Sequence, residues 1–220
     1  VHPKHLIPDG ESHEWYLSRL TPTDLVLDVG GGAGGHARRV ARHCRIVLVI
    51  DRSMPAERTE GNLLFVRWEA SAPLPMPWRY WDAVLCLDVI EHVDDRQALL
   101  AEIRRVLRTG GLLFISAPNR ETSWRRRLRA AGLDSRSDPD HRVEYTRHEF
   151  VGKLYAAGFA LADAIRPTTL DTPWAGLQDA LGACWLPLYA WFHRRRRRAV
   201  GQDTAESTGF QAVAAKVDKR

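Results

Sequence analysis

The stretch Leu25-Val-Leu-Asp-Val-Gly-Gly-Gly-Ala-Gly-Gly35 decides the fold class of this chain. Its first five residues are apolar and branched, apart from one aspartate, and predict a buried strand. Five glycines follow within six positions, and the segment from 36 to 43 is predicted to begin a helix. Glycines let the backbone turn tightly and let a ligand approach it closely. A strand, a glycine turn and a helix in this order therefore indicate a nucleotide-binding site.

The glycine loop fits two templates. Gly30, Gly32 and Gly35 match the dinucleotide fingerprint G-x-G-x-x-G. Asp28, Gly30, Gly32 and Gly34 match acid-x-G-x-G-x-G, which resembles motif I of the class I S-adenosylmethionine-dependent methyltransferases. The second template also accounts for Asp28, because a carboxylate there would repel a pyrophosphate and attract the cationic amino group of a methionine moiety. A tight turn with a helix-capping aspartate is the purely structural alternative.

A second apolar strand is predicted from 45 to 51, and it ends in Asp51, 23 residues after Asp28. An acid at this offset binds ribose hydroxyls in both templates, so Asp51 supports an adenosine site without selecting the cofactor. We assign Arg52, the next residue, to the same cofactor site.

A third strand, from 62 to 68, precedes Glu69-Ala70-Ser-Ala-Pro-Leu-Pro-Met76. This segment resembles the acid-Ala-x-x-Leu-Pro-Phe segment of the same methyltransferases. The resemblance implies that Glu69 meets the adenine amino group and that the backbone N–H of Ala70 meets a ring nitrogen. Glu replaces the commoner Asp here, and a solvated Glu in a proline-rich loop is the alternative.

The stretch Trp81-Asp82-Ala-Val-Leu-Cys-Leu-Asp88-Val-Ile-Glu91-His92-Val93 closely resembles motif II and the residues after it in the type-11 group, which includes ubiquinone-biosynthesis-like methyltransferases. Asp88 ends the predicted strand, where parallel sheets bind ligands, and we assign it to the cofactor site. The resemblance covers about residues 20 to 165. It implies an α/β, Rossmann-like, doubly wound seven-stranded sheet, parallel with an antiparallel C-terminal edge strand at 209–217.

Two histidines are candidate catalytic bases, because methyl transfer from a sulfonium needs alignment and, for some acceptors, proton removal. His92 follows the fourth predicted strand, and His141 lies in Asp140-His141-Arg-Val-Glu-Tyr145-Thr, which resembles a segment of the same group. The alternatives are a loop-holding residue at a helix start for His92 and a helix-entry motif for His141. In that motif Thr146 caps the helix and Glu149 completes a capping box.

The spacing of Asp88, Glu91 and His92 resembles the carboxylate-x-x-Glu-His pattern that ubiquinone-type relatives use for a divalent metal. We assign no metal to this single cluster.

The composition of the chain favours a single domain. With 220 residues we expect one methyltransferase domain, 1–220, with substrate-side insertions at 120–146 and 172–207. Three scattered cysteines give no disulfide framework and no metal spacing, which favours a cytoplasmic protein, and no cleavable leader is visible. The net charge is +5 and five arginines stand together at 194–198, so the basicity is local and we expect no nucleic-acid partner.

The segment 174–198 combines tryptophans, leucines and alanines with this arginine run. Such a segment suits an interfacial anchor on an anionic membrane, and a lid or a dimer helix with a solvated basic end is the alternative. The sequence leaves the oligomeric state open.

The function predicted from the sequence is methyl transfer from S-adenosylmethionine to a small-molecule, sugar or lipid-linked acceptor, by family analogy a hydroxyl. An NAD-dependent oxidoreductase and a non-catalytic S-adenosylmethionine-binding protein are the alternatives.

Overall fold

The structure is a computed structural model, and it describes residues 14–69, 73–74 and 76–217. Its strands are β1 (Leu25–Val29), β2 (Ile46–Asp51), β3 (Arg58–Glu60), β4 (Leu63–Arg67), β5 (Trp81–Leu87), β6 (Leu107–Pro118), β7 (Phe159–Leu161), β8 (Arg166–Pro167) and β9 (Gly209–Lys216). Its helices are α1 (Glu14–Leu17), α2 (Gly35–Val40), α3 (Arg96–Val106), α4 (Ser123–Ala130), α5 (Arg147–Ala156), α6 (Ala175–Cys184) and α7 (Leu186–Val200).

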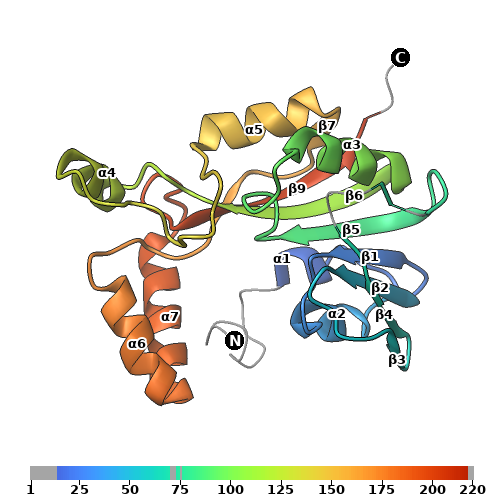
Figure 1. Ribbon diagram of the computed structural model, residues 1–220, viewed down its shortest axis with the longest axis horizontal. Coiled ribbons are helices and arrows are strands. Elements are labelled where there is room, and N and C mark those ends of the chain that lie inside the picture. The colour runs from blue at the N-terminus through green and yellow to red at the C-terminus, as the bar shows by residue number, and fades with distance from the viewer. Residues whose placement is uncertain (1–13, 70–72, 75, 218–220) are drawn as a thin grey trace.

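All nine strands belong to one sheet (Figure 1), in the order β3-β4-β2-β1-β5-β6-β9-β7, with β8 paired to β9. The pairs within β4-β2-β1-β5-β6 are parallel. β1 lies at the centre of this block, between β2 and β5, where the order of the strands reverses. In open α/β sheets, ligands bind at such a switch point, beyond the carboxyl ends of the strands.

The sheet confirms the predicted fold class and corrects its details. It has nine strands rather than seven, because β3 and β8 are too short to produce a periodic sequence pattern. The C-terminal strand β9 is antiparallel, as predicted, but it lies between β6 and β7 instead of at the edge. Its pairing with β6 extends from Leu112 opposite Ala215 to Pro118 opposite Gly209.

Alternating side chains of β1 pack into two separate hydrophobic cores, one on each face of the sheet. Val26 packs with α1 and α2 on one side of the sheet, while Leu27 and Val29 pack with α3 and α5 on the other. Figure 1 shows these two helix layers on opposite faces of the sheet. The strands therefore read as nearly continuous apolar runs, as strands covered on both faces do.

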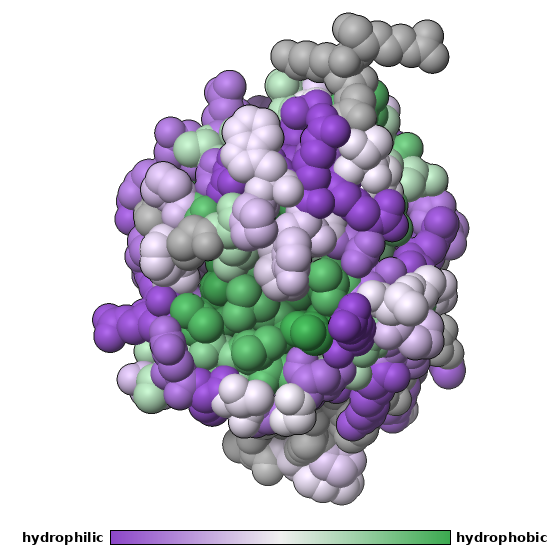
Figure 2. All heavy atoms as spheres, turned by 90° about the vertical axis from the view of Figure 1, so that its right-hand side faces the viewer, coloured by the Kyte–Doolittle hydropathy of each residue, from purple (hydrophilic) through white to green (hydrophobic). Residues whose placement is uncertain are grey.

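The crossover between β2 and β4 contains the short strand β3 instead of a helix. Several apolar side chains of this part of the sheet are consequently only partly buried against the core, among them Leu25, Leu48 and Val66. Figure 2 shows an apolar area framed by hydrophilic side chains on the right-hand side of the molecule as drawn in Figure 1.

The predicted insertions contain helices α4, α6 and α7, which lie together at the other end of the molecule (Figure 1). That the chain forms a single domain with these segments on its substrate side stays a prediction. Among the described residues, no helix combines the length and the hydropathy that crossing a bilayer requires.

Candidate active site

The glycine loop directly follows β1, at the edge of the sheet where the parallel strands have their carboxyl ends. Gly30, Gly32 and Gly34 have φ values of 69°, 52° and 85°, a region that side chains rarely adopt. A Cβ on Gly30 would lie 2.5 Å from Val89, and one on Gly34 would lie 2.5 Å from Phe65, so both glycines are also required by packing. Among the described residues, a Cβ on Gly32 would meet only Asp51, at 4.0 Å. Gly32 therefore borders open space, as a backbone that a ligand approaches would.

Asp28 lies under this loop and is 2 % exposed. Its Oδ2 accepts no hydrogen bond from the described residues, although it lies 2.5 Å from the position that a Cβ on Gly31 would take. Burial and, secondly, the negative charge of Asp51 raise the pKa of Asp28 to about 7. A buried carboxylate without a donor is costly, and a cationic ligand group would remove that cost. Asp28 is thus a suitable partner for the cationic amino group of a methionine moiety, as predicted from the sequence.

Asp51 ends β2 and holds the glycine loop. Its Oδ2 accepts a hydrogen bond from the backbone N–H of Gly32 at 2.9 Å. Its Oδ1 accepts hydrogen bonds from the backbone N–H and the hydroxyl of Ser53 at 2.7 and 2.5 Å. Oδ1 thus uses both of its lone pairs, but Oδ2 accepts a single bond and keeps acceptor capacity for a ribose hydroxyl.

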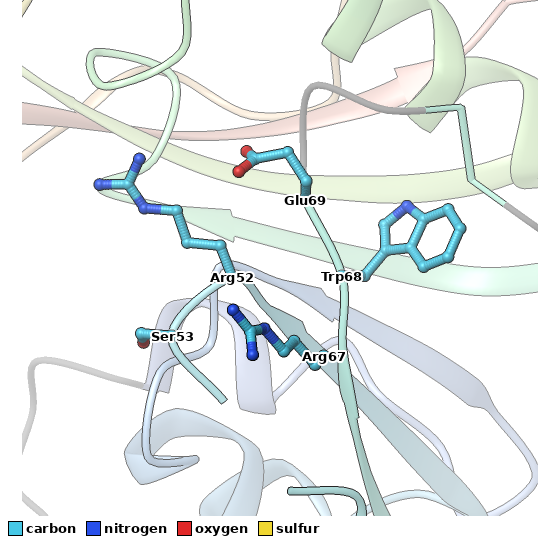
Figure 3. A pocket seen from close by; sticks show the side chains of 5 residues that line it. All are labelled: Arg52, Ser53, Arg67, Trp68 and Glu69. Carbon is cyan, nitrogen blue, oxygen red and sulfur yellow. The ribbon is translucent and has the colours of Figure 1, made fainter. Parts of the chain in front are cut away.

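A pocket of about 680 Å³ opens beside Asp51 and is lined by Arg52, Ser53, Arg67, Trp68 and Glu69. In Figure 3 the guanidinium of Arg52 and the carboxylate of Glu69 extend to the same side, whereas the Trp68 ring points away from them. Two predicted cofactor residues therefore line one pocket next to the predicted ribose ligand. Ala70 lies outside the described residues.

Asp88 follows β5 with a φ of 54°, a strained conformation for a residue with a side chain. The carboxylate of Asp88 accepts a hydrogen bond from the Ser116 hydroxyl at 2.7 Å. The backbone N–H of Asp88 donates to the hydroxyl oxygen of Ser116 at 2.9 Å. The aspartate is thus anchored to β6. Val89, the next residue, packs on Gly30 and so joins this turn to the glycine loop.

The two candidate bases meet in space although 49 positions separate them. The rings of His92 and His141 pack edge to face with their centroids 4.8 Å apart. The backbone N–H of Arg142 donates to the carbonyl of Glu91 at 2.9 Å and holds the two loops together. Burial and the neighbouring His141 lower the pKa of His92, which favours a neutral imidazole.

Glu144 orients His141. Nδ1 of His141 lies 2.8 Å from Glu144 Oε1, and both side chains are buried. Burial alone would raise the pKa of Glu144, but the hydrogen bond with His141 and the charge of Arg125 hold it at about 2. Because an ionised carboxylate only accepts, Nδ1 carries the proton and Nε2 is left as the basic nitrogen. Nε2 lies 3.9 Å from Glu91.

Arg125 fixes Glu144 from the far side. Its Nη1 donates to Glu144 at 2.5 Å and its Nε to Asp171 at 3.1 Å, and all three side chains are almost completely buried. Asp171 also accepts from the Thr122 hydroxyl at 2.6 Å. A chain of charged hydrogen bonds therefore runs from the residues before α6, through α4, to the candidate base.

Sequence reasoning missed Glu144, Arg125 and Asp171. Glu144 follows His141 by three positions, a spacing that could have indicated contact, but Arg125 is one of four arginines between 125 and 129 and nothing local distinguishes it. The helix-entry motif after His141 is confirmed: Thr146 accepts from the Glu149 N–H and Glu149 accepts from the Thr146 N–H.

Glu91, His92 and His141 together form a group that could hold a metal ion, since one ligand atom from each lies within 4.8 Å of the others. This group shares Glu91 and His92 with the spacing noted in the sequence, but His141 takes the third position instead of Asp88.

Comparison with known proteins agrees with this geometry. Residues 27–115 match the model of the methyltransferase domain family of type 11. A probable S-adenosylmethionine-dependent methyltransferase of Mycobacterium tuberculosis is 33% identical over 153 residues, covering 67% of this chain and 54% of that protein. A ubiquinone biosynthesis O-methyltransferase of Coxiella burnetii is 29% identical over 102 residues, covering 43% of this chain and 44% of that protein. The chain thus spans about half the length of the curated relatives it matches.

Solved structures show the same fold. The 1,6-didemethyltoxoflavin N1-methyltransferase of Burkholderia thailandensis, solved with S-adenosylhomocysteine, has a TM-score of 0.59 at 20% identity and covers 96% of this chain and 80% of its own. The cyclase SpnF has a TM-score of 0.64 at 20% identity and covers 94% and 80%. The motif order, the glycine loop over a buried Asp28, the sheet and these relatives place the chain in the class I S-adenosylmethionine-dependent methyltransferase family.

Proposed function

We propose that this domain transfers a methyl group from S-adenosylmethionine to a hydroxyl group of a small-molecule, sugar or lipid-linked acceptor in the cytoplasm. The observation that carries the choice of a hydroxyl is the pair of His141 and ionised Glu144. A hydroxyl is a weak nucleophile until a base removes its proton, and this pair presents a basic Nε2.

The residues on the cofactor side fit the family's cofactor. Asp28 offers a buried carboxylate to its amino group, Gly32 leaves room along the loop, and Asp51 has acceptor capacity for the ribose. When bound, S-adenosylmethionine would supply an activated methyl group to the acceptor oxygen, with S-adenosylhomocysteine as the leaving group. The comparisons favour this cofactor over NAD.

On the acceptor side, the chain positions a base and holds a proton. His141 Nε2 accepts the hydroxyl proton, and Glu144 stabilises the imidazolium that forms, as the carboxylate of a catalytic triad does. Arg125 keeps Glu144 ionised and in place. His92, with its lowered pKa, stays neutral beside His141 and does not compete for the proton.

The test is product formation across an acceptor panel, followed by mass spectrometry, with His141→Ala and Glu144→Gln as variants. Loss of a general base is expected to lower the rate by about 10²–10⁴ while S-adenosylhomocysteine binding, measured by calorimetry, is retained. His148→Ala is the matched control, since that histidine is exposed on α5. Normal turnover by His141→Ala would refute the role of the base, and an absence of methylated product with intact cofactor binding would favour a non-catalytic binding protein.

Chelation separates a base from a metal ligand at the same cluster. If His141 acts as the base, activity survives treatment with EDTA. Loss of activity that Mg²⁺ or Mn²⁺ restores would instead assign Glu91, His92 and His141 to a metal.

A further inference from the structure

The helices α6 and α7 form a hairpin that projects from the sheet, with Trp185 at the turn between them (Figure 1). Leu177 and Leu181 are four residues apart and lie on one face of α6, Trp174 directly precedes this helix, and Trp185 directly follows it. Their exposed fractions are 64%, 54%, 49% and 62%. We call these four residues the apolar stripe. Large apolar side chains gathered at one place on a surface mark an interaction site more often than scattered ones do.

The arginines of α7 divide between two faces of the helix. Arg196 turns inward, where its Nε donates to the carbonyl of Leu170 at 3.0 Å. Arg194, Arg195 and Arg198 are exposed, and we call them the basic face. Trp191 shares this side: it is exposed, and the guanidinium of Arg195 lies 5.6 Å from the centre of its ring. Consecutive residues surround a helix, but Arg194, Arg195 and Arg198 fall on the exposed side of α7 together with Trp191.

Positive charge is concentrated at this end of the protein. Helices α4 and α7 contain nine arginines and no acidic residue. Because the whole chain has a net charge of +5, the remainder carries a net charge of −4. The hydrogen bond from Ser123 at the start of α4 to Glu206, a few residues after α7, keeps the two helices at the same end of the molecule. The hairpin itself, 175–200, contains five arginines and one acidic residue, so it carries +4 of the chain's net charge of +5.

We propose that the hairpin docks the protein on the surface of an anionic lipid bilayer, with the apolar stripe in the interface and the basic face on the headgroups. Exposed tryptophans prefer this boundary, and arginine guanidinium groups bind lipid phosphates. A second copy of the chain fits less well, because a symmetric contact would bring the basic faces together without acidic partners. Docking would present the proposed acceptor site to a lipid-linked substrate, but the binding itself does not rest on the proposed function.

The test is sedimentation of the full chain with vesicles of phosphatidylcholine and phosphatidylglycerol, compared with phosphatidylcholine alone. Binding to the anionic vesicles at low salt, weakening as salt is added, is the expected result. Replacing the three residues of the basic face with Ser should weaken binding about a hundredfold, because each arginine near an anionic surface contributes about fivefold. The apolar variant Leu181→Ser, Trp185→Ser should also weaken it.

Matched controls remove the same chemistry elsewhere. Arg45→Ser, Arg147→Ser, Lys153→Ser deletes three exposed charges outside the hairpin, and Trp78→Ser deletes a tryptophan that is 73% exposed before β5. The three charges should matter far less than the basic face, and Trp78→Ser should leave binding unchanged. Circular dichroism and S-adenosylhomocysteine affinity should be unchanged in every variant, which separates this proposal from the proposed function.

Three outcomes would overturn the proposal. One is an absence of parent binding to the anionic vesicles at low salt. Another is full binding by the basic-face variant. The third is a salt-insensitive dimer that forms without lipid and is lost in Leu181→Ser, Trp185→Ser, which would assign the apolar stripe to a second copy of the chain.

Discussion

Replacing Asp28 with Asn is expected to stabilise the ligand-free protein and to weaken cofactor binding. The carboxyl group is buried, its Oδ2 accepts no hydrogen bond from the described residues, and its pKa is raised from 3.8 to about 7 by burial and by Asp51. The folded chain therefore binds this proton more tightly than the unfolded chain does. As the pH rises from about 4 to about 7, ionisation destabilises the fold, and the loss is complete above that range.

The magnitude follows from the size of the shift. Roughly three pKa units at about 1.4 kcal/mol each set an upper bound of about 4 kcal/mol on the destabilisation at high pH. The Asn amide is itself a buried polar group, so we expect a net gain of about 1–3 kcal/mol. For a chain of this length that raises Tm by about 2–12 °C.

The assay is thermal denaturation without ligand at two pH values. At about pH 5 Asp28 of the folded chain is mostly protonated, and at about pH 8.5 it is mostly ionised. The gain of Asp28→Asn over the parent should be larger at the higher pH. Calorimetry should show S-adenosylmethionine binding weakened by tenfold or more, because a charged hydrogen bond of about 1.5–3 kcal/mol is lost. Asp94→Asn, at a side chain that is 76% exposed, should change neither quantity. An Asp28→Asn protein that is less stable at both pH values, or that binds the cofactor normally, would refute the reasoning.

Three further changes test other parts of the structure. Gly32→Val should abolish cofactor binding in calorimetry. The control Gly61→Val imposes a similar backbone strain, at a φ of 61° in open space, and should not change cofactor binding. Equal loss in both variants would mean that backbone strain, and not the approach of the ligand to Gly32, is responsible. Asp51→Ala should weaken S-adenosylhomocysteine binding by about 1.5–3 kcal/mol, and an unchanged affinity would remove Asp51 from the ribose site. Arg125→Met leaves two buried carboxylates without their cation and should lower the free energy of unfolding by about 3–5 kcal/mol in denaturant titrations. The control Arg126→Met, at an exposed side chain, should change this free energy little. Equal effects of the two substitutions would contradict the buried network.

Much of the parallel half of the sheet was predictable because its signals are local. An apolar run ending in an acid, followed by glycines, determines β1 and its turn without reference to the rest of the chain. The capping box of Thr146 and Glu149 is likewise complete within four residues. The short strands β3 and β8 could not be predicted, since their pairing depends on neighbours that packing brings alongside them.

Only some of the residues on the acceptor side of the site could be predicted from the sequence. His92 and His141 could each be proposed from their own motifs, but nothing local indicates that their rings are in contact. Glu144 and Arg125 become an orienting pair only because α4 folds back beside the loop that carries His141. A buried ion pair depends on which side chains lose water together, and that is a property of packing.

The sequence by itself determined the family, the order of the main strands and the residues of the glycine loop, because each is encoded within short segments whose conformation depends on near neighbours. The tertiary structure alone decided that β9 lies between β6 and β7, that Glu144 and not solvent meets His141, and that Arg196 turns inward while Arg194 stays exposed. These outcomes depend on long-range packing, which selects among conformations that are nearly equal in energy for an isolated segment.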